Sequence, residues 1–345
     1  DALPISGETG MLESLMRAAQ ALAASDIHLS AGLPPLGRVN GTLQALEPEA
    51  LGNAPIRAMI DSVLPESQRR QFAEGAACDF AFSVEGLGRY RANAYRQQRG
   101  VGMALRPIPE TVPSLEAVQA PAILKQLAAH SHGLVLIVGP TGSGKTTTLA
   151  AMVDYINHTA AKHVLTIEDP VEFVYAPDRA LITQREVGRD TPSFADALKA
   201  ALREDPDVIL LGEMRDLETI RLALTAAETG HLVLATLHTA TAAQAVERIV
   251  DVFPGSERDL ARTLLTDVLR AVVAQELLPR KDGQGRIAAH EVLVGTPAVR
   301  NLIREHKTAQ LVSAMQTGQQ QGMQTMAQSL EWLARDGLII QSAML

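Results

Sequence analysis

The stretch "GPTGSGKTTT", residues 139–148, combines glycines, one lysine and several hydroxyls at a spacing that can do chemistry. It fits the pattern G-x-x-x-x-G-K-[ST], with Gly139, Gly144, Lys145 and Thr146 in the fixed positions. Glycines let consecutive backbone N–H groups converge on phosphate oxygens, and a helix that starts there adds a field of about half a positive charge. The pattern predicts a nucleotide phosphate-binding loop, whose expected contacts are Gly139, Pro140, Thr141, Gly142, Ser143, Gly144, Lys145, Thr146 and Thr147.

The residues on either side of this loop support the interpretation. "LVLIVG", residues 134–139, is typical of a buried strand, and "KTTTLAAMVDYI" predicts a helix with an apolar face. Lys145 is expected to reach the β and γ phosphates of ATP, and the hydroxyl of Thr146 is expected to bind Mg²⁺. The alternative is a glycine-rich turn with a chance lysine, and the flanking strand and helix argue against it.

Carboxylates that could assist a nucleotide follow two other predicted strands. "DPDVILLGEMRD" predicts a strand with Glu213 at its end, where one carboxylate suffices for Mg²⁺ because this ion usually keeps several waters. The alternative for Glu213 is an ordinary surface carboxylate. "TIEDPVEF" carries Glu168, Asp169 and Glu172, any of which could orient an attacking water, and the residue types alone do not choose among them.

Two histidines, His231 and His238, stand seven residues apart in "GHLVLATLHT". His238 falls at the carboxyl end of a predicted strand and is therefore the better placed of the two to sense the γ-phosphate. Either histidine can instead be a structural hydrogen bonder, and the sequence offers no ligand-spaced cysteine or histidine partners for a metal.

The composition limits the classes of protein to consider. At 345 residues the chain is long enough for about two domains, and 46% hydrophobic with 20% charged residues is typical of a globular protein. A net charge of −8 disfavours nucleic acid as a partner. The single cysteine, Cys78, excludes an internal disulfide and a four-cysteine zinc site, as expected in a reducing cytosol. No apolar run approaches the roughly 20 residues that span a bilayer, so we expect a soluble protein.

The first third of the chain predicts a small mixed α/β domain. Residues 11–24 have the apolar spacing of a helix, and Asn40-Gly41 favours a tight turn between two short strands. A polar helix is expected near residues 56–74, followed by a second hairpin around residues 86–88 and a further strand.

From about residue 114 strands and helices alternate, which predicts an α/β fold with a parallel sheet and helices on both faces. Ligands of such sheets lie at the carboxyl ends of the strands. Gly139, Glu213 and His238 all fall at such ends, so three separate segments are expected to form one site. The strands are expected at residues 134–139, 163–168, 207–212 and 231–237.

Beyond residue 252 the chain predicts helices, including residues 258–278 and 296–305. Residues 1–10 have neither the charged nor the apolar region of a signal peptide, and we interpret them as a non-native or disordered leader. The expected domains are an N-terminal domain over 11–106, a proline-rich linker over 107–113 and a nucleotide-binding domain over 114–345.

Four motifs occur in the order found in type IV pilus retraction ATPases of the PilT family, within the larger secretion ATPase superfamily, and the chain resembles these proteins. They are the Walker A loop "GPTGSGKTTT", the aspartate box "TIEDPVEF", the Walker B stretch "LREDPDVILLGEMRD" and the histidine box "AAETGHLVLATLHT". The similarity includes "SDIHLSAGLPP" and "AVRNLIRE" and covers essentially residues 11–340. The histidine box departs from the family in "LVLAT", where a phenylalanine and a glycine more often precede the threonine.

The resemblance implies a PAS-like N-terminal domain, a RecA-like ATPase domain and a homohexameric ring. Residue by residue it assigns the phosphate and Mg²⁺ contacts to Lys145 and Thr146, the Walker B acid to Glu213, the catalytic glutamate to Glu172, the histidine box to His231 and His238, and arginine fingers to Arg91 and Arg106. The strand pattern agrees for the arginines, which alternate with apolar residues in "GRYRANAY" and "GVGMALRP". Each arginine could instead be a solvated strand residue.

The resemblance also implies a cytoplasmic location at the inner face of the inner membrane. The implied partners are an inner-membrane pilus platform protein and a related retraction ATPase, with membrane association only through partners. Arg300 and Arg304, in "AVRNLIRE", are then expected to couple the nucleotide state to the pilus machinery.

Three rival functions compete with retraction. A pilus-extension or type II secretion assembly ATPase often has a paired Cys-x-x-Cys zinc module, which this sequence lacks. A RecA-like motor that acts on nucleic acid is disfavoured by the net charge of −8. A nucleotide-binding partner subunit that does not hydrolyse ATP is disfavoured by the full set of lysine, acidic and arginine residues.

Overall fold

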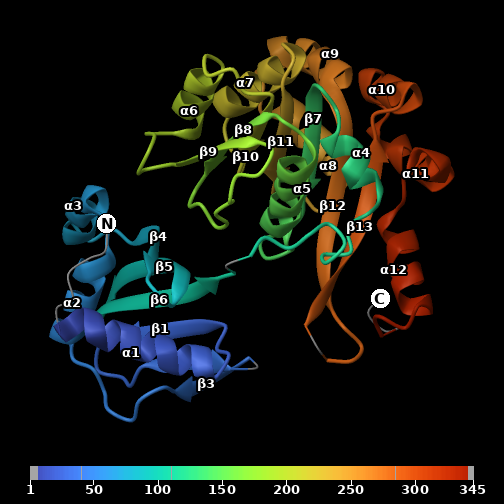
Figure 1. The fold of residues 1–345 in the computed structure, drawn as a ribbon. Helices are drawn as coiled ribbons and strands as arrows, with labels where there is room; N and C mark the ends of the chain where they lie inside the picture. The colour runs from blue at the N-terminus through green and yellow to red at the C-terminus, as the bar shows by residue number, and fades with distance from the viewer. Residues whose placement is uncertain (1–6, 40, 110, 284, 341–345) are drawn as a thin grey trace. The chain divides into compact units, whose positions relative to one another are not determined.

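The computed structural model describes residues 7–39, 41–109, 111–283 and 285–340 (Figure 1). By its internal contacts the chain divides into two compact units. The N-terminal unit comprises Asp1–Thr111 and the short segment Pro170–Val174, and the second unit comprises Val112–Asp169 and Tyr175–Leu345. The segment Pro170–Val174 thus groups with the N-terminal unit although it lies far along the chain.

The N-terminal unit is built on an antiparallel sheet of six strands with the order β3-β2-β1-β6-β5-β4. Helices α1 and α2 pack on one face of this sheet, and Met16, Ile60 and Met103 are fully buried between them. The strands are β1 (Asp26–Ser30), β2 (Leu36–Val39), β3 (Thr42–Ala45), β4 (Cys78–Val84), β5 (Gly88–Gln97) and β6 (Gly100–Ile108), and the helices are α1 (Gly7–Ala21), α2 (Asn53–Val63) and α3 (Glu66–Ala73).

The two predicted hairpins of this unit are confirmed as β2–β3 and β4–β5. Gly41 lies at the turn of the first hairpin, and Asn40, which was also assigned to this turn, is outside the described residues. The single polar helix predicted near residues 56–74 is wrong, because it is interrupted between α2 and α3. Pro65 causes the break, since a residue that precedes proline avoids helical angles, and Leu64 is extended with φ −70° and ψ 126°.

The second unit is built on a mixed sheet of seven strands with the order β13-β12-β7-β11-β10-β8-β9. All neighbouring pairs are parallel except β12 and β13. Every residue of β7, β10 and β11 is buried. Their sequences are continuous apolar runs because a strand covered on both faces needs apolar side chains on both sides. The strands are β7 (Gly133–Val138), β8 (His163–Glu168), β9 (Leu181–Glu186), β10 (Val208–Leu211), β11 (Leu232–Leu237), β12 (Leu269–Pro279) and β13 (Arg286–Val294).

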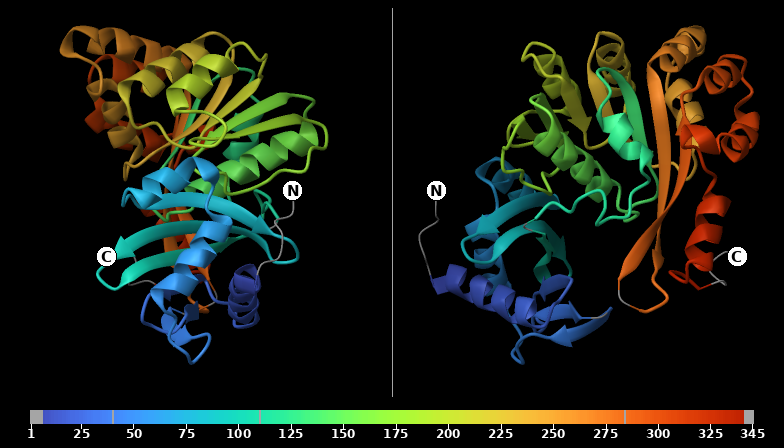
Figure 2. Two further views of the ribbon diagram at one scale, coloured as in Figure 1. Left: turned by 90° about the vertical axis from the view of Figure 1, so that its left-hand side faces the viewer. Right: turned by 45° about the vertical axis from the view of Figure 1, so that its right-hand side comes forward.

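Helices cover both faces of the large sheet, and Figure 2 shows the C-terminal helices, in red, along its β13 side. The predicted α/β class with a mainly parallel sheet is confirmed, with β13 as the antiparallel exception. The α-helices are α4 (Ile123–Ala128), α5 (Lys145–Thr159), α6 (Phe194–Ala201), α7 (Leu217–Glu228), α8 (Ala242–Asp251), α9 (Arg258–Val268), α10 (Pro297–Arg304), α11 (Leu311–Thr317) and α12 (Met326–Arg335).

The predicted helix over residues 258–278 is wrong in its second half. Helix α9 ends at Val268, and β12 begins at the next residue and pairs in parallel with β7. Short apolar runs fit a strand or a helix equally well, and here pairing with a distant strand decides the structure. Strands β9 and β13 were likewise not predicted.

One buried carboxylate holds the start of a helix in the C-terminal part. Glu291, on β13, accepts a hydrogen bond of 2.8 Å from the N–H of Ala242, the first residue of α8. Burial raises the pKa of Glu291, and the backbone N–H groups of Ala242 and Met326 oppose the rise. The side chain therefore caps α8, whose N-terminal end favours a negative charge.

The neighbouring His290 is buried, and its Nε2 atom has no hydrogen-bond partner among the described residues. Burial lowers the pKa of His290 to about 4 from its ordinary value of 6.5. His290 therefore becomes protonated in the folded protein only at a pH well below that at which it is protonated in the unfolded chain. The contribution of neutral His290 to stability is complete above pH 6.5 and is lost as the pH falls toward about 4.

We predict that His290→Gln removes this part of the pH dependence. Between pH 7 and pH 5 the free energy of unfolding of the wild type should fall by about 2 kcal/mol more than that of the variant. Urea denaturation at the two pH values measures the difference. His306→Gln, which changes an exposed histidine, should keep the wild-type drop. Equal drops in wild type and His290→Gln would contradict the prediction.

Candidate nucleotide site

The predicted phosphate-binding loop connects β7 to α5. Gly139 directly follows β7, and Gly144, with a left-handed φ of +88°, directly precedes α5. A β-carbon on Gly139 would lie 2.4 Å from the backbone oxygen of Gln275, and one on Gly144 would lie 2.8 Å from the Nε2 atom of Gln275. Both separations are too short for real atoms. The two glycines are therefore required by the neighbouring strand β12 as well as by the loop itself.

Lys145 is held inside the loop. Its side chain is only 7% exposed, and its Nζ atom donates to the carbonyl oxygens of Gly139 at 2.8 Å and Pro140 at 2.9 Å. Burial lowers the pKa of Lys145, and the charge of Glu213 opposes the shift. The hydroxyl of Ser143 is buried within the same loop and has no partner among the described residues. A phosphate oxygen fits this set of groups, because it can accept from the hydroxyl and from the ammonium.

Glu213 and His238 meet at the same edge of the sheet as the loop. Glu213 follows β10 and is 9% exposed, and its Oε2 atom lies 3.3 Å from Nε2 of His238, which follows β11. Its Oε1 atom lies 2.6 Å from the guanidinium of Arg215. Strand β11 lies between β10 and β7, so Glu213 comes from the second strand away from the one that leads into the loop.

The donors available for a metal are few. Among the described residues, no group of three or more histidine, cysteine, aspartate or glutamate side chains could hold a metal ion. The hydroxyl of Thr146 is exposed at the start of α5, and Glu213 is the carboxylate that follows β10. Mg²⁺ fits such a sparse set, since it is usually bound by one or two protein ligands together with waters and substrate phosphates.

The structure does not bring His231 to this site within one chain. His231 directly precedes β11, and its backbone oxygen accepts from the N–H of Gly133, the first residue of β7. Its Nδ1 atom lies 3.0 Å from the carbonyl oxygen of Ala226. The loop follows the other end of β7, and strands of six residues extend about 20 Å. Within one chain His231 therefore lies far from the loop, and its assignment as a nucleotide-binding residue stays a prediction.

The three acids of "TIEDPVEF" have different surroundings. Glu168 ends β8, is 6% exposed and accepts from the hydroxyl of Thr166 at 2.7 Å. Asp169 is exposed. Glu172 belongs to the segment that groups with the N-terminal unit, and its Oε1 atom lies 3.1 Å from the guanidinium of Arg91 in that unit. Glu172 is thus the acid already paired with one of the two predicted arginine fingers.

Arg91 and Arg106 are direct neighbours in the N-terminal sheet. They face each other across the β5–β6 pair, on the side opposite the buried residues Ala92 and Leu105. Arg106 is 70% exposed and lies 2.7 Å from Asp26 of β1. Burial acts to raise the pKa of Asp26, but hydrogen bonds and the charge of Arg106 hold it below its usual value. The two arginines therefore form one patch on the outer face of this sheet.

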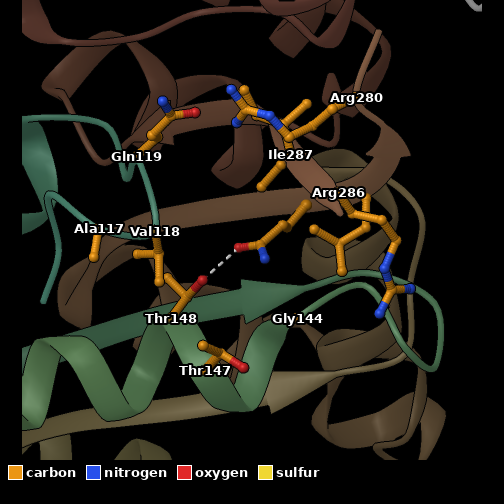
Figure 3. Close-up of a pocket in the computed structure, with 12 residues that line it drawn as sticks. Ala117, Val118, Gln119, Gly144, Thr147, Thr148, Arg280, Arg286 and Ile287 are labelled. Atoms are coloured by element: carbon orange, nitrogen blue, oxygen red, sulfur yellow. Dashed lines mark hydrogen bonds between the residues drawn. The ribbon is translucent and has the colours of Figure 1, made fainter. Parts of the chain in front are cut away.

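A cavity of about 260 Å³ adjoins the loop in the second unit (Figure 3). Its lining includes Val118 and Gln119 of the chain before α4, Thr147 of α5 and Gln275 of β12. The β12 residues were not predicted to belong to the site, because a helix was expected over residues 258–278. Arg280 and Arg286 also line the cavity. Their positive charges were the one feature of the sequence that could have indicated an anion-binding surface here.

The described residues contain no helix long and apolar enough to cross a membrane.

Comparison with known proteins identifies the family. Residues 114–343 match the family described as "Type II/IV secretion system protein". The chain is 53% identical to the type IV pilus retractation ATPase PilT of Pseudomonas aeruginosa, over 92% of each chain. It is 51% identical to a twitching motility protein of Neisseria gonorrhoeae, over 96% of this chain and 88% of that protein.

A solved structure agrees with the sequence matches. The pilus retraction motor PilT with bound ADP is 45% identical, and it superposes with a TM-score of 0.88 over 99% of this chain and 96% of that one. The predicted fold class, a small PAS-like α/β domain before a RecA-like ATPase domain with a parallel sheet, is confirmed by this match. The family consists of ATPases, so the chain is an enzyme that hydrolyses a nucleoside triphosphate. It belongs to the PilT family of type IV pilus retraction ATPases.

Proposed function

We propose that this protein hydrolyses ATP to ADP and phosphate, with Mg²⁺, and that a homohexamer uses the energy to retract type IV pili. The observation that carries the proposal is the phosphate-binding loop at the same sheet edge as Glu213 and His238. The relative that binds ADP and the relatives named for retraction and twitching motility support the nucleotide and the direction of the motor.

In this proposal each group at the sheet edge has one task. Lys145 neutralises charge on the transferred phosphate, and the Ser143 hydroxyl and the loop N–H groups orient it. Thr146 and Glu213 would hold Mg²⁺, which when bound neutralises charge on the β and γ phosphates. His238 positions the Glu213 carboxylate through their contact of 3.3 Å and lies where it can respond to the γ-phosphate.

The cavity beside the loop is proposed to hold the base and ribose. It lies next to Thr147 and Thr148, at the start of the helix that follows the phosphates. Val118 offers an apolar surface for a base, and Arg280 and Arg286 offer charge toward the sugar and phosphates.

Glu172 is proposed to orient the attacking water, and Arg91 and Arg106 are proposed to contact the γ-phosphate. The ion pair of Arg91 with Glu172, with exposed fractions of 43% and 30%, is then a resting partnership that both residues leave during turnover. Such half-exposed pairs are weak, so separating them costs little.

The proposed partners follow from the same family. They are an inner-membrane pilus platform protein and a related retraction ATPase. The protein would bind them at the cytoplasmic face of the inner membrane. Its net charge of −8 disfavours nucleic acid as a partner. The decisive experiment supplies this chain to cells that lack their own retraction motor. Restored retraction supports the proposal. Restored pilus assembly would favour an extension ATPase, and purified protein without ATPase activity would favour a nucleotide-binding partner subunit.

We predict that Glu213→Gln and Glu172→Gln fail in different ways. Glu213→Gln should weaken Mg²⁺-dependent nucleotide binding as well as turnover, because a metal ligand loses its charge. Glu172→Gln should bind Mg·ATP normally and hydrolyse it at least about 100-fold more slowly, as expected for a group that acts on the attacking water. Titration with a fluorescent ATP analogue and a phosphate-release assay measure both effects.

The matched control is Glu331→Gln, an exposed glutamate on α12, which should match the wild type in both assays. Glu172→Gln with more than half the wild-type rate would remove Glu172 from the mechanism.

We predict that Arg106→Lys loses at least about 100-fold in ATPase rate while its melting temperature stays near that of the wild type. A planar guanidinium bridges phosphate oxygens in a way that lysine cannot reproduce. The lysine can still pair with Asp26, so the sheet is preserved. Arg70→Lys, on an exposed part of α3, serves as the control. Wild-type turnover by Arg106→Lys would leave this arginine as a surface partner of Asp26 only.

Helix α10 carries the "AVRNLIRE" motif and packs on α9. Val299 and Ile303 are buried, as its apolar spacing predicts. Arg300 donates to the carbonyl oxygen of Leu269 at 3.3 Å, and Arg304 lies 3.7 Å from Asp267. The two arginines therefore contact the end of α9 and the start of β12 and do not simply form a free outer surface.

We predict that replacing Arg300 and Arg304 with alanine stops retraction in cells while most of the ATPase rate remains. The lost contacts at the end of α9 should lower stability by about 1–2 kcal/mol, which a hexamer tolerates. Arg335→Ala, an exposed arginine on α12, should retract normally. A parallel loss of ATPase activity would show that the helix serves hydrolysis, and normal retraction would remove it from the coupling.

A further inference from the structure

We propose that Gln275 is a positioning residue for the reaction. Its side-chain amide fixes the phosphate-binding loop against β12 and so sets the geometry in which the loop receives phosphate. The inference rests on the proposed hydrolysis of ATP at this loop, and it assigns a task to a residue on a strand that carries none of the four family motifs.

The side chain of Gln275 bonds both to the loop and to the first turn of α5. Its Nε2 atom donates to the backbone oxygen of Ser143 at 2.7 Å, and its Oε1 atom accepts from the hydroxyl of Thr148 at 2.8 Å. The dashed line in Figure 3 is the bond from Thr148. All three residues are at most 3% exposed, so water does not compete for these hydrogen bonds. In the sequence Gln275 lies 132 residues after Ser143 and 127 residues after Thr148.

The strand register explains why Gln275 is in this place. Ala274 of β12 pairs with Val138, the last residue of β7. The next residues of the two strands, Gln275 and Gly139, therefore lie side by side as the loop begins. The missing β-carbon of Gly139 leaves room for the Gln275 backbone, and that of Gly144 leaves room for its side chain. The loop is thus packed against one residue at its start and at its end.

Only an amide satisfies both partners. The backbone oxygen of Ser143 needs a donor, and the Thr148 hydroxyl donates to an acceptor. A glutamate would keep the acceptor but turn a second oxygen toward Ser143. A leucine would leave a buried carbonyl without a partner. The chemistry of the site therefore selects glutamine over residues of similar size.

Gln275 also lines the cavity assigned to the base and ribose. The same side chain thus touches the loop that receives the phosphates and the wall that receives the rest of the nucleotide. A shift of this amide would change both parts of the site together, so its loss should affect the binding of nucleotide and the chemical step.

The test compares Gln275→Glu, Gln275→Leu, Thr148→Val and Thr148→Ser with the wild-type hexamer. Gln275→Glu and Gln275→Leu should lower kcat/KM for ATP by about 100-fold, shared between a raised KM and a lowered kcat. Thr148→Val should lose about 10-fold, and Thr148→Ser should recover most of that loss because it restores the hydroxyl. The control is Glu276→Gln, an exposed neighbour on β12, which should match the wild type.

A second readout separates positioning from general support of the fold. The rise in melting temperature caused by Mg·ADP should be smaller in Gln275→Glu than in the wild type, in addition to any fall in the melting temperature without nucleotide. A lower melting temperature without nucleotide, combined with an undiminished rise, would mean that Gln275 only stabilises the fold. Wild-type kcat and KM in Gln275→Leu would also overturn the inference.

Failure of the proposed function gives a different result. If the wild-type hexamer hydrolyses ATP but does not retract pili, the motor assignment fails and the positioning test stands. If the wild type hydrolyses no ATP, the comparison of melting temperatures with Mg·ADP still decides whether Gln275 orders the loop.

Discussion

Parallel pairing of the buried strands is the constraint on which the rest of this protein depends. Strand β7 pairs with β11 and β12, and β11 pairs with β10, all in parallel. Their carboxyl ends therefore meet at one edge, and the loop at Gly139, Glu213 and His238 are neighbours for that reason alone. A slip of one strand would leave buried backbone groups unpaired, which makes the register, and with it the site, costly to disturb.

Local patterns were sufficient to predict the central part of the fold. A run such as "LVLIV" before a glycine loop can hardly be anything other than a buried strand, and the helix after it follows from its capping loop and apolar face. The C-terminal part failed because its decisive interaction is not local. Residues 258–278 are rich in leucine and alanine, and only pairing with β7 makes the second half a strand.

The site shows the same division. Motifs predicted the loop, Glu213 and His238, since each lies at the end of a strand that the sequence reveals. Gln275 was missed because the strand that carries it was missed. His231 differs from these residues, because it is close to His238 in sequence but lies at the opposite end of the straight strand β11.

The cap at Glu291 has a mechanical consequence. Helix α8 begins shortly after His238, and its first N–H donates to the Glu291 carboxylate of β13 at 2.8 Å. A displacement that moves the start of α8 away from β13 must break a hydrogen bond to a buried carboxylate, which costs more than breaking the same bond in water. The start of α8 and strand β13 are therefore expected to move together.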